Sequence, residues 1–296
     1  MKYYMEVWDH VTNNQKRVLV DNGEIRFCPN SVEERNIYEM DTSAFNVYSG
    51  KVKLDRDVGF AFQNGHGMSY VKRMLLYGFS SFIYVVDIDY ESLTERLIEE
   101  ARQHFKTCPI DYILAVRVPL ERLTQSWIRK LKVLSIPLTF FYVHSEEELI
   151  HAPWQRYLEA AFPVRMMFLI DQYHVDLHEK EQQSILQGWE RIVKHWRVNS
   201  YFRIPKPLEK APLLFLKRLG LYPQKGSFDS GSDADYFMYL DKVEGDTPIV
   251  LPDIIVLRGN IVKHGTTWLI EGEKGRELTS IVPEQFLPIN AVYQYD

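Results

Sequence analysis

Four strongly apolar segments in the middle of the chain alternate with longer segments of helical periodicity. The apolar segments are Ser81–Ile88, Tyr112–Val118, Leu138–Val143 and Arg165–Ile170. The helical segments are Met68–Tyr77, Ser92–Phe105, Leu120–Leu134, Glu146–Phe162 and Leu177–Trp196. Near-continuous runs of Val, Ile, Leu, Phe and Tyr are typical of parallel strands that are covered on both faces. The alternation therefore predicts βαβ units with right-handed crossovers, and an α/β fold built on a parallel sheet.

The two ends of the chain have the character of antiparallel β-structure. Asn22–Gly23 lies between two β-rich segments, which is typical of a two-residue hairpin turn. Arg258–Gly259–Asn260 predicts a second hairpin near the other end. Further short strands are expected at Tyr3–Trp8, Ile37–Met40, Phe45–Tyr48 and 236–240. A Pro-containing linker at 199–210 separates the middle of the chain from this C-terminal β-region.

Composition places the chain among ordinary globular proteins. Its 296 residues are 46% hydrophobic and 25% charged. A net charge of −5 without a basic block argues against a nucleic-acid partner, and no apolar run reaches the roughly 18 residues of a membrane span. Two cysteines are too few for a disulfide framework, and Met1–Asp9 is unlike a signal peptide, so we expect a reduced, cytoplasmic protein.

Two C-terminal phrases resemble the amidohydrolase superfamily, the cyclic-amide hydrolases such as dihydroorotase and hydantoinase. They are Lys225–Asp241 (KGSFDSGSDADYFMYLD) and Asp253–Gly265 (DIIVLRGNIVKHG), which are similar to the part of the chain that re-enters the family's β-sandwich. The preceding APLLFLKRLGLYP at 211–223 resembles the segment before that sandwich, and residues 1–50 resemble its N-terminal part. The resemblance implies a barrel inserted into a discontinuous sandwich, with Asp233 and Asp235 in a structural role.

The resemblance and the periodicity together predict an α/β fold with two parts. One is a composite β-sandwich from residues 1–59 and 222–296, and the other is a barrel-like α/β domain at 60–221. Eight βα units need about 200 residues or more, and the segment available for them is shorter. We therefore expect an incomplete or shortened (β/α) barrel.

The metal site that the resemblance implies is missing from the sequence. The family begins its barrel with two histidines one residue apart that hold a divalent metal, and the corresponding Gly50–Gly59 (GKVKLDRDVG) contains none. Asp55 and Asp57 in this stretch are either oxygen ligands for a harder cation or, as we favour, part of an exposed turn. Because several imidazoles and a carboxylate must converge to activate water, we expect no metal cofactor, the alternative being one divalent metal such as zinc.

Polar residues nevertheless recur where the predicted strands end. They are Asp87, Asp89, Arg117, His144 and Asp171, with His174 shortly after. Ligands of parallel α/β folds bind at the carboxyl ends of strands, so these residues form our candidate pocket, whereas the catalytic residues remain unknown. The alternative is ordinary capping and ion pairing, as in the capping box expected of Ser145 and Glu148.

Three functions remain open at this stage. The first is a degenerate, non-catalytic binding or regulatory protein whose small-molecule or protein partner is unknown. The second is a hydrolase of non-peptide carbon–nitrogen bonds in which His144, Asp171 and His174 act as ligands or base and Arg117 binds an acidic substrate. The third is a structural subunit, because an aromatic content of 14% would favour a homo-oligomer.

Overall fold

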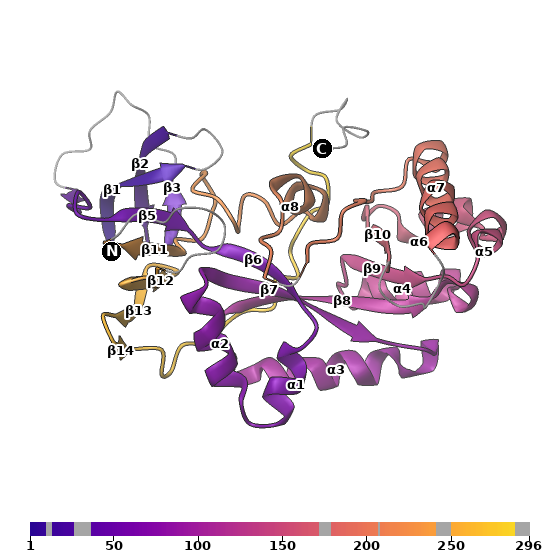
Figure 1. Cartoon of the computed structure of the whole chain (residues 1–296), viewed down its shortest axis with the longest axis horizontal. Helices are drawn as coiled ribbons and strands as arrows, with labels where there is room; N and C mark the ends of the chain where they lie inside the picture. Colours follow the sequence, from indigo (N-terminus) through magenta and orange to yellow (C-terminus); the bar gives the residue numbers. More distant parts are fainter. Residues whose placement is uncertain (10–13, 27–36, 172–178, 207, 241–249, 288–296) are drawn as a thin grey trace.

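A curled parallel sheet of five strands runs through the middle of the molecule (Figure 1). The computed structural model describes the chain except for residues 10–13, 27–36, 172–178, 207, 241–249 and 288–296. The strands are β6 (Lys51–Asp55), β7 (Phe79–Asp87), β8 (Asp111–Pro119), β9 (Leu138–Tyr142) and β10 (Met167–Ile170). Their spatial order is β10-β9-β8-β7-β6. The predicted α/β class and partial barrel are confirmed, with β6 as a fifth strand that the sequence did not predict.

Helices connect and cover these strands. They are α1 (Val58–Gln63), α2 (Gly67–Leu76), α3 (Thr94–His104), α4 (Gln125–Val133), α5 (Glu146–His151), α6 (Trp154–Ala161), α7 (Glu179–Trp196) and α8 (Leu213–Leu219). The single helix expected over Glu146–Phe162 is two helices, because the backbone is extended at Ala152, before Pro153. Figure 1 shows α1, α2 and α3 on one side of the sheet and α8 on the other.

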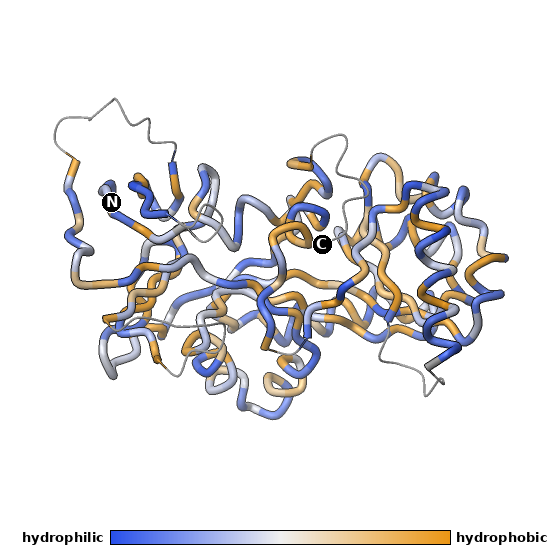
Figure 2. The backbone as a smooth tube through the Cα atoms, turned by 45° about the horizontal axis from the view of Figure 1, so that its top comes forward, coloured by the Kyte–Doolittle hydropathy of each residue, from blue (hydrophilic) through white to orange (hydrophobic). Residues whose placement is uncertain are grey.

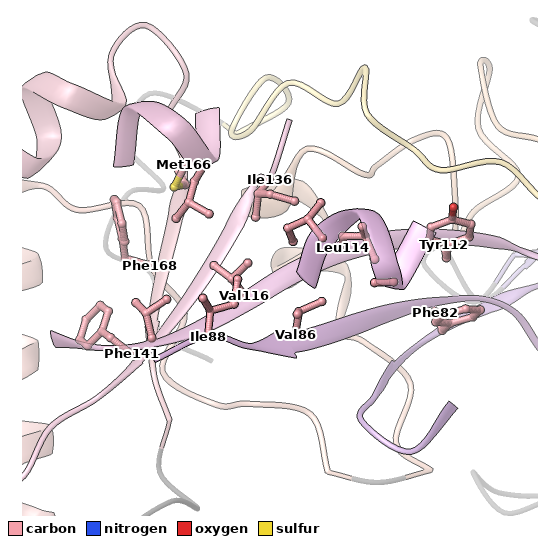
Figure 3. Close-up of a cluster of buried hydrophobic side chains, with 14 of the residues drawn as sticks. Phe82, Val86, Ile88, Tyr112, Leu114, Val116, Ile136, Phe141, Met166 and Phe168 are labelled. Carbon is pink, nitrogen blue, oxygen red and sulfur yellow. The ribbon is translucent and has the colours of Figure 1, made fainter. Parts of the chain in front are cut away.

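The helix-covered outer face of the sheet holds the largest apolar core. Phe82, Leu114, Val116 and Phe141 project from the strands into it, and Trp127 of α4 is fully buried there. Figure 3 shows this cluster in close-up. In Figure 2 hydrophobic positions concentrate along the central strands, whereas the helices alternate between hydrophobic and hydrophilic residues. That alternation is the pattern of helices with one buried face.

The inner face of the sheet, which a complete barrel would enclose, is filled by the chain itself. Val52, Leu54 and Phe140 belong to a second core together with Phe215 and Leu216 of α8. The segment that leads into α8 touches both edge strands of the sheet. The carbonyl of residue 199 accepts a hydrogen bond from the backbone of β10, and the amide of residue 211 donates one to β6. We call the described residues 199–206 and 208–211 the covering segment, since Ile204 and Ala211 pack in the core on this inner face.

Two antiparallel sheets lie beside the parallel one. The first contains β1 (Lys2–Asp9), β2 (Asn14–Asp21), β3 (Glu24–Arg26) and β4 (Tyr38–Glu39), of which β4 is parallel to β1. The second contains β5 (Asn46–Ser49), β11 (Tyr236–Tyr239), β12 (Ile254–Leu257), β13 (Asn260–His264) and β14 (Thr267–Trp268). Residues near both chain ends share the second sheet, because β5 pairs with β11. A third apolar core, which includes Met5, Val20 and Met238, joins the two sheets.

Both predicted hairpin turns are confirmed, and they meet each other. Asn22 and Gly23 connect β2 to β3, and Arg258 and Gly259 connect β12 to β13; all four have positive φ. A Cβ built on Gly23 would lie 2.3 Å from the carbonyl oxygen of Arg258. Only a residue without a side chain fits at Gly23, because its φ is +82° and another backbone lies against it.

A buried charge cluster ties the parallel sheet to the C-terminal β-region. The ammonium of Lys225, whose side chain is 1% exposed, lies 2.6 to 3.0 Å from three carboxylates. These belong to Asp111, at the start of β8, and to Asp233 and Asp235. Arg258 and Arg276 also bind Asp111, so three cations face three anions. Asp235 accepts the backbone N–H of Arg258 as well, which confirms the expected structural role of this phrase.

None of the described helices is both long enough and apolar enough to cross a bilayer.

Candidate functional site

The carboxyl ends of four of the five parallel strands, β6, β7, β8 and β10, carry a layer of charged side chains. Alternate residues of a strand point to the same face. Leu54 and Phe140 pack in the inner core, and the guanidinium of Arg56 lies over the Phe140 ring at 5.8 Å. On β7, β8 and β10 the same alternation runs from inner-core residues to Asp87, Arg117 and Asp171. These three side chains therefore belong to the inner face as well. The layer therefore closes the inner face of the sheet at the end where ligands of such folds bind.

Asp171 is the centre of this layer. Its side chain is fully buried and lies between two guanidinium groups. Arg56 reaches both carboxylate oxygens of Asp171, at 3.1 and 3.2 Å, and Arg117 contacts Oδ2 at 3.0 Å. Such bidentate pairing is the strongest geometry for an arginine and a carboxylate. The arrangement carries one net positive charge.

Asp87 supplies a second carboxylate to Arg117 from the solvent side. The Nε of Arg117 lies 2.7 Å from Oδ1 of Asp87, and the Asp87 side chain is 64% exposed. Burial alone lowers the pKa of the Arg117 guanidinium, but the hydrogen bond to Asp171 and the charges of Asp87 and Asp171 outweigh it and raise that pKa. Arg117 thus stays charged, with one buried partner and one that solvent can replace.

The remaining candidate residues lie at the rim. Asp89 accepts a hydrogen bond from the Tyr142 hydroxyl at 3.3 Å. His144 is exposed, and its ring packs edge-on against Tyr142 with centroids 5.9 Å apart. The backbone N–H of His144 donates to Glu148, and Ser145 caps α5 as expected. His174 and His178 lie outside the described residues. The structure therefore brings Asp87, Arg117 and Asp171 together and leaves Asp89 and His144 beside them.

The expectation of an exposed turn at Asp55 is wrong. Asp55 ends β6, is 2% exposed and points to the helix side of the sheet, out of phase with the inner-facing Leu54. It accepts hydrogen bonds from Lys53 Nζ at 2.5 Å and from the Tyr70 hydroxyl at 2.9 Å. The backbone amides of residues 57 and 58 donate to it too. These four donors occupy its acceptor sites. The second residue, Asp57, is exposed as predicted.

A cavity of about 360 Å³ opens beside the charged layer. It is lined by residues 53–57 at the end of β6 and by Ile204 and Pro205 of the covering segment. Arg56 is therefore shared between the cavity and the bond to Asp171, and its side chain remains 36% exposed. A ligand in this cavity would meet a guanidinium on one wall and apolar surface on the other.

The charged layer does not fit a divalent metal. Its inward-facing residues on β6 are Leu54 and Arg56, neither of which is a metal ligand. The buried carboxylate of Asp171 is already held by two cations. Among the residues that the structure describes, no group of three or more His, Cys, Asp or Glu side chains could hold a metal ion.

Sequence reasoning missed Arg56 and Tyr142. Lys51, Lys53 and Asp55 hid β6, because they interrupt the apolar run by which a buried strand is recognised. The alternation of Val52, Leu54 and Arg56 is the pattern that would have revealed it. Tyr142 follows Leu138 and Phe140 in the same alternation.

Comparison of the structure places it in a known class, an α/β protein with a partial barrel. It is similar to dihydropyrimidinase from Brevibacillus agri, with a TM-score of 0.65 at 10% identity over 94% of this chain and 98% of that one. D-hydantoinase from a Bacillus species gives 0.65 at 10% identity, over 96% and 99%. A triazine hydrolase variant gives 0.51 at 8% identity, over 91% and 96%.

The chain thus shares its overall fold with a dihydropyrimidinase and a D-hydantoinase, proteins of the kind that the sequence resemblance named. No protein-family model and no curated protein sequence matches the chain.

Proposed function

We propose that this chain is a non-catalytic protein of amidohydrolase fold that binds a small carboxylate at the charged layer. The single observation that carries the proposal is the burial of Asp171 between Arg56 and Arg117. In this arrangement an ion-pair network takes the inner positions where the superfamily would hold a metal. We also propose that the two antiparallel sheets form the composite sandwich, and that the parallel sheet, β6 included, is a reduced barrel.

The preference for an anion follows from the charges. Arg56, Arg117 and Asp171 together carry one positive charge, and Asp87 is the exposed group that balances it. A ligand carboxylate could take the place of Asp87 on Arg117, since an exposed ion pair contributes only about 0 to 1 kcal/mol. The cavity beside Arg56 would then receive the rest of the ligand.

The competing function is metal-dependent hydrolysis of a carbon–nitrogen bond, which the sequence resemblance implies; a dihydropyrimidinase and a D-hydantoinase are among the proteins of similar fold. Metal analysis of untagged protein by plasma mass spectrometry separates the two. We expect a folded protein with far less than one equivalent of zinc, manganese or iron. One tightly bound equivalent would overturn the non-catalytic proposal.

Ligand binding is tested by calorimetry with succinate, benzoate and N-carbamoylglycine, using uncharged hydantoin as the control. Binding of a carboxylate should weaken at least tenfold in Arg117→Gln. Asp87→Asn removes the competing carboxylate, so it should strengthen binding. If hydantoin binds as well as the carboxylates, or if neither substitution changes affinity, the charged layer is not an anion site.

A further inference from the structure

A second cavity lies on the other side of β6, between this edge strand and α2. Its volume is about 290 Å³. Among the residues that line it are Lys53, Asp57, Tyr70, Arg73, Met74 and Phe79. Because Lys53 points away from the inner face, this cavity is distinct from the charged layer, although Lys53 and Asp57 border both cavities.

Two polar residues that line this cavity, Lys53 and Tyr70, are satisfied by Asp55, which does not line it. Lys53 and Asp55 form a buried ion pair, and the Tyr70 hydroxyl donates to the same carboxylate. Burial and the charge of Asp55 raise the pKa of Tyr70, which therefore stays protonated as a donor. This trio is electrically neutral, and we call its two members that line the cavity, Lys53 and Tyr70, the floor.

Two opposite charges border the floor without pairing. Arg73 stacks over the Tyr70 ring at 5.0 Å, and both Arg73 and Asp57 lie close enough to act on the Tyr70 hydroxyl. Within the described chain neither side chain has an ion-pair partner, and no ion pair joins the two. A guanidinium and a carboxylate that line the same cavity without pairing are each available to a ligand group of opposite charge.

The rest of the wall is apolar. Met74 and Phe79 are 4% and 3% exposed, so they are fixed by the surrounding core. Tyr77 and Leu208 lie at the rim and are 40% and 60% exposed. An apolar pocket with a few placed polar groups is the usual form of a small-molecule site.

We propose that this cavity binds a free α-amino acid with an apolar or aromatic side chain. Arg73 receives its carboxylate, because a guanidinium matches a carboxylate in charge and geometry. Asp57 receives its ammonium group. The side chain packs on Met74 and Phe79, with Tyr77 and Leu208 over the opening. This site goes beyond the proposed function and does not depend on it.

Isothermal titration of the full-length protein with L-phenylalanine and L-leucine tests the site. Phenethylamine lacks the carboxylate and 3-phenylpropionate lacks the amine, so in an Arg117→Gln background, where the charged layer no longer favours carboxylates, each should bind at least tenfold more weakly than L-phenylalanine. Arg73→Gln and Asp57→Asn should each weaken L-phenylalanine at least tenfold. Arg129→Gln, an exposed arginine on α4, is the matched control and should bind as the wild type.

Two results would overturn the proposal. One is no binding of either amino acid to folded wild-type protein at millimolar concentration. The other is binding that survives both Arg73→Gln and Asp57→Asn. Arg117→Gln separates the two sites, because it should weaken carboxylate binding at the charged layer at least tenfold and leave L-phenylalanine binding to this cavity unchanged. The melting temperature of each unliganded variant verifies that it folds.

Discussion

Arg56 and Asp171 follow the two outermost strands of the parallel sheet, and yet two contacts of 3.1 and 3.2 Å join their side chains. Three strands lie between β6 and β10 in the sheet, so the sheet must curl for the two ends to meet. Asp171 therefore stabilises the curvature of the parallel sheet and is also part of the candidate site.

Replacement of Asp171 should be severely destabilising. Asp171→Asn leaves Arg56 and Arg117 facing each other with only the exposed Asp87 as a counter-charge, and loss of one partner of a buried pair costs about 3 to 5 kcal/mol. Urea unfolding measures the change. Asp87→Asn removes the exposed partner of the same arginine and should cost less than about 1 kcal/mol. Equal losses of stability in the two variants would contradict the role of Asp171 in stabilising the curled sheet.

Acid should weaken the fold through Asp111. Burial alone would raise the pKa of this carboxyl, but Lys225, Arg276 and Arg258 more than offset burial and lower the pKa from 3.8 to about 2. Because the pKa is lower in the folded state, the stabilisation is complete above the unfolded pKa near 4. It is lost as the pH falls from 4 to 2, by about 2 kcal/mol.

The free energy of unfolding measured at intervals from pH 6 to pH 2 tests this dependence. Asp111→Asn should be less stable at pH 6 and should show a flatter profile between pH 4 and pH 2. An unchanged slope in that variant would assign the acid sensitivity to other carboxyls.

A methyl group at Gly23 should disrupt the junction of the two hairpins. Gly23→Ala places a Cβ 2.3 Å from the Arg258 carbonyl, whereas Gly272 has a similar φ of +89° and nothing within 4 Å. Both alanine variants carry the left-handed backbone cost of about 1 to 2 kcal/mol. Gly23→Ala should lose at least about 2 kcal/mol more than Gly272→Ala in thermal unfolding, because its contact is with backbone.

Cys108 should be unreactive in the folded protein. It is fully buried, and burial raises the pKa of its thiol to about 12. Since the thiolate is the reactive form, labelling by a maleimide in a Cys28→Ser background should be limited by unfolding and should accelerate with urea. Rapid labelling in buffer would contradict the burial.

The sequence predicted most of what depends on local pattern. The apolar runs located β7 to β10, and Asn22–Gly23 located the first hairpin turn, because these features depend on neighbouring residues. β6 was missed because its polar Lys53 and Asp55 face a helix that only the tertiary structure supplies. The expectation that polar residues at the carboxyl ends of parallel strands lie together also placed Asp87, Arg117 and Asp171 at one edge of the sheet. Nothing in the sequence showed that they neutralise one another, since their contacts join residues far apart in the chain.

The position of α8 has a consequence for biosynthesis. The ribosome delivers all five strands of the sheet before residues 204–221, whose apolar side chains cover its inner face. A nascent chain that ends at β10 therefore presents Leu54, Phe140 and Leu169 to water. Such transiently exposed apolar surface invites aggregation or chaperone capture, so the interval in which roughly the 50 residues after β10 are translated is the vulnerable period in the life of this protein.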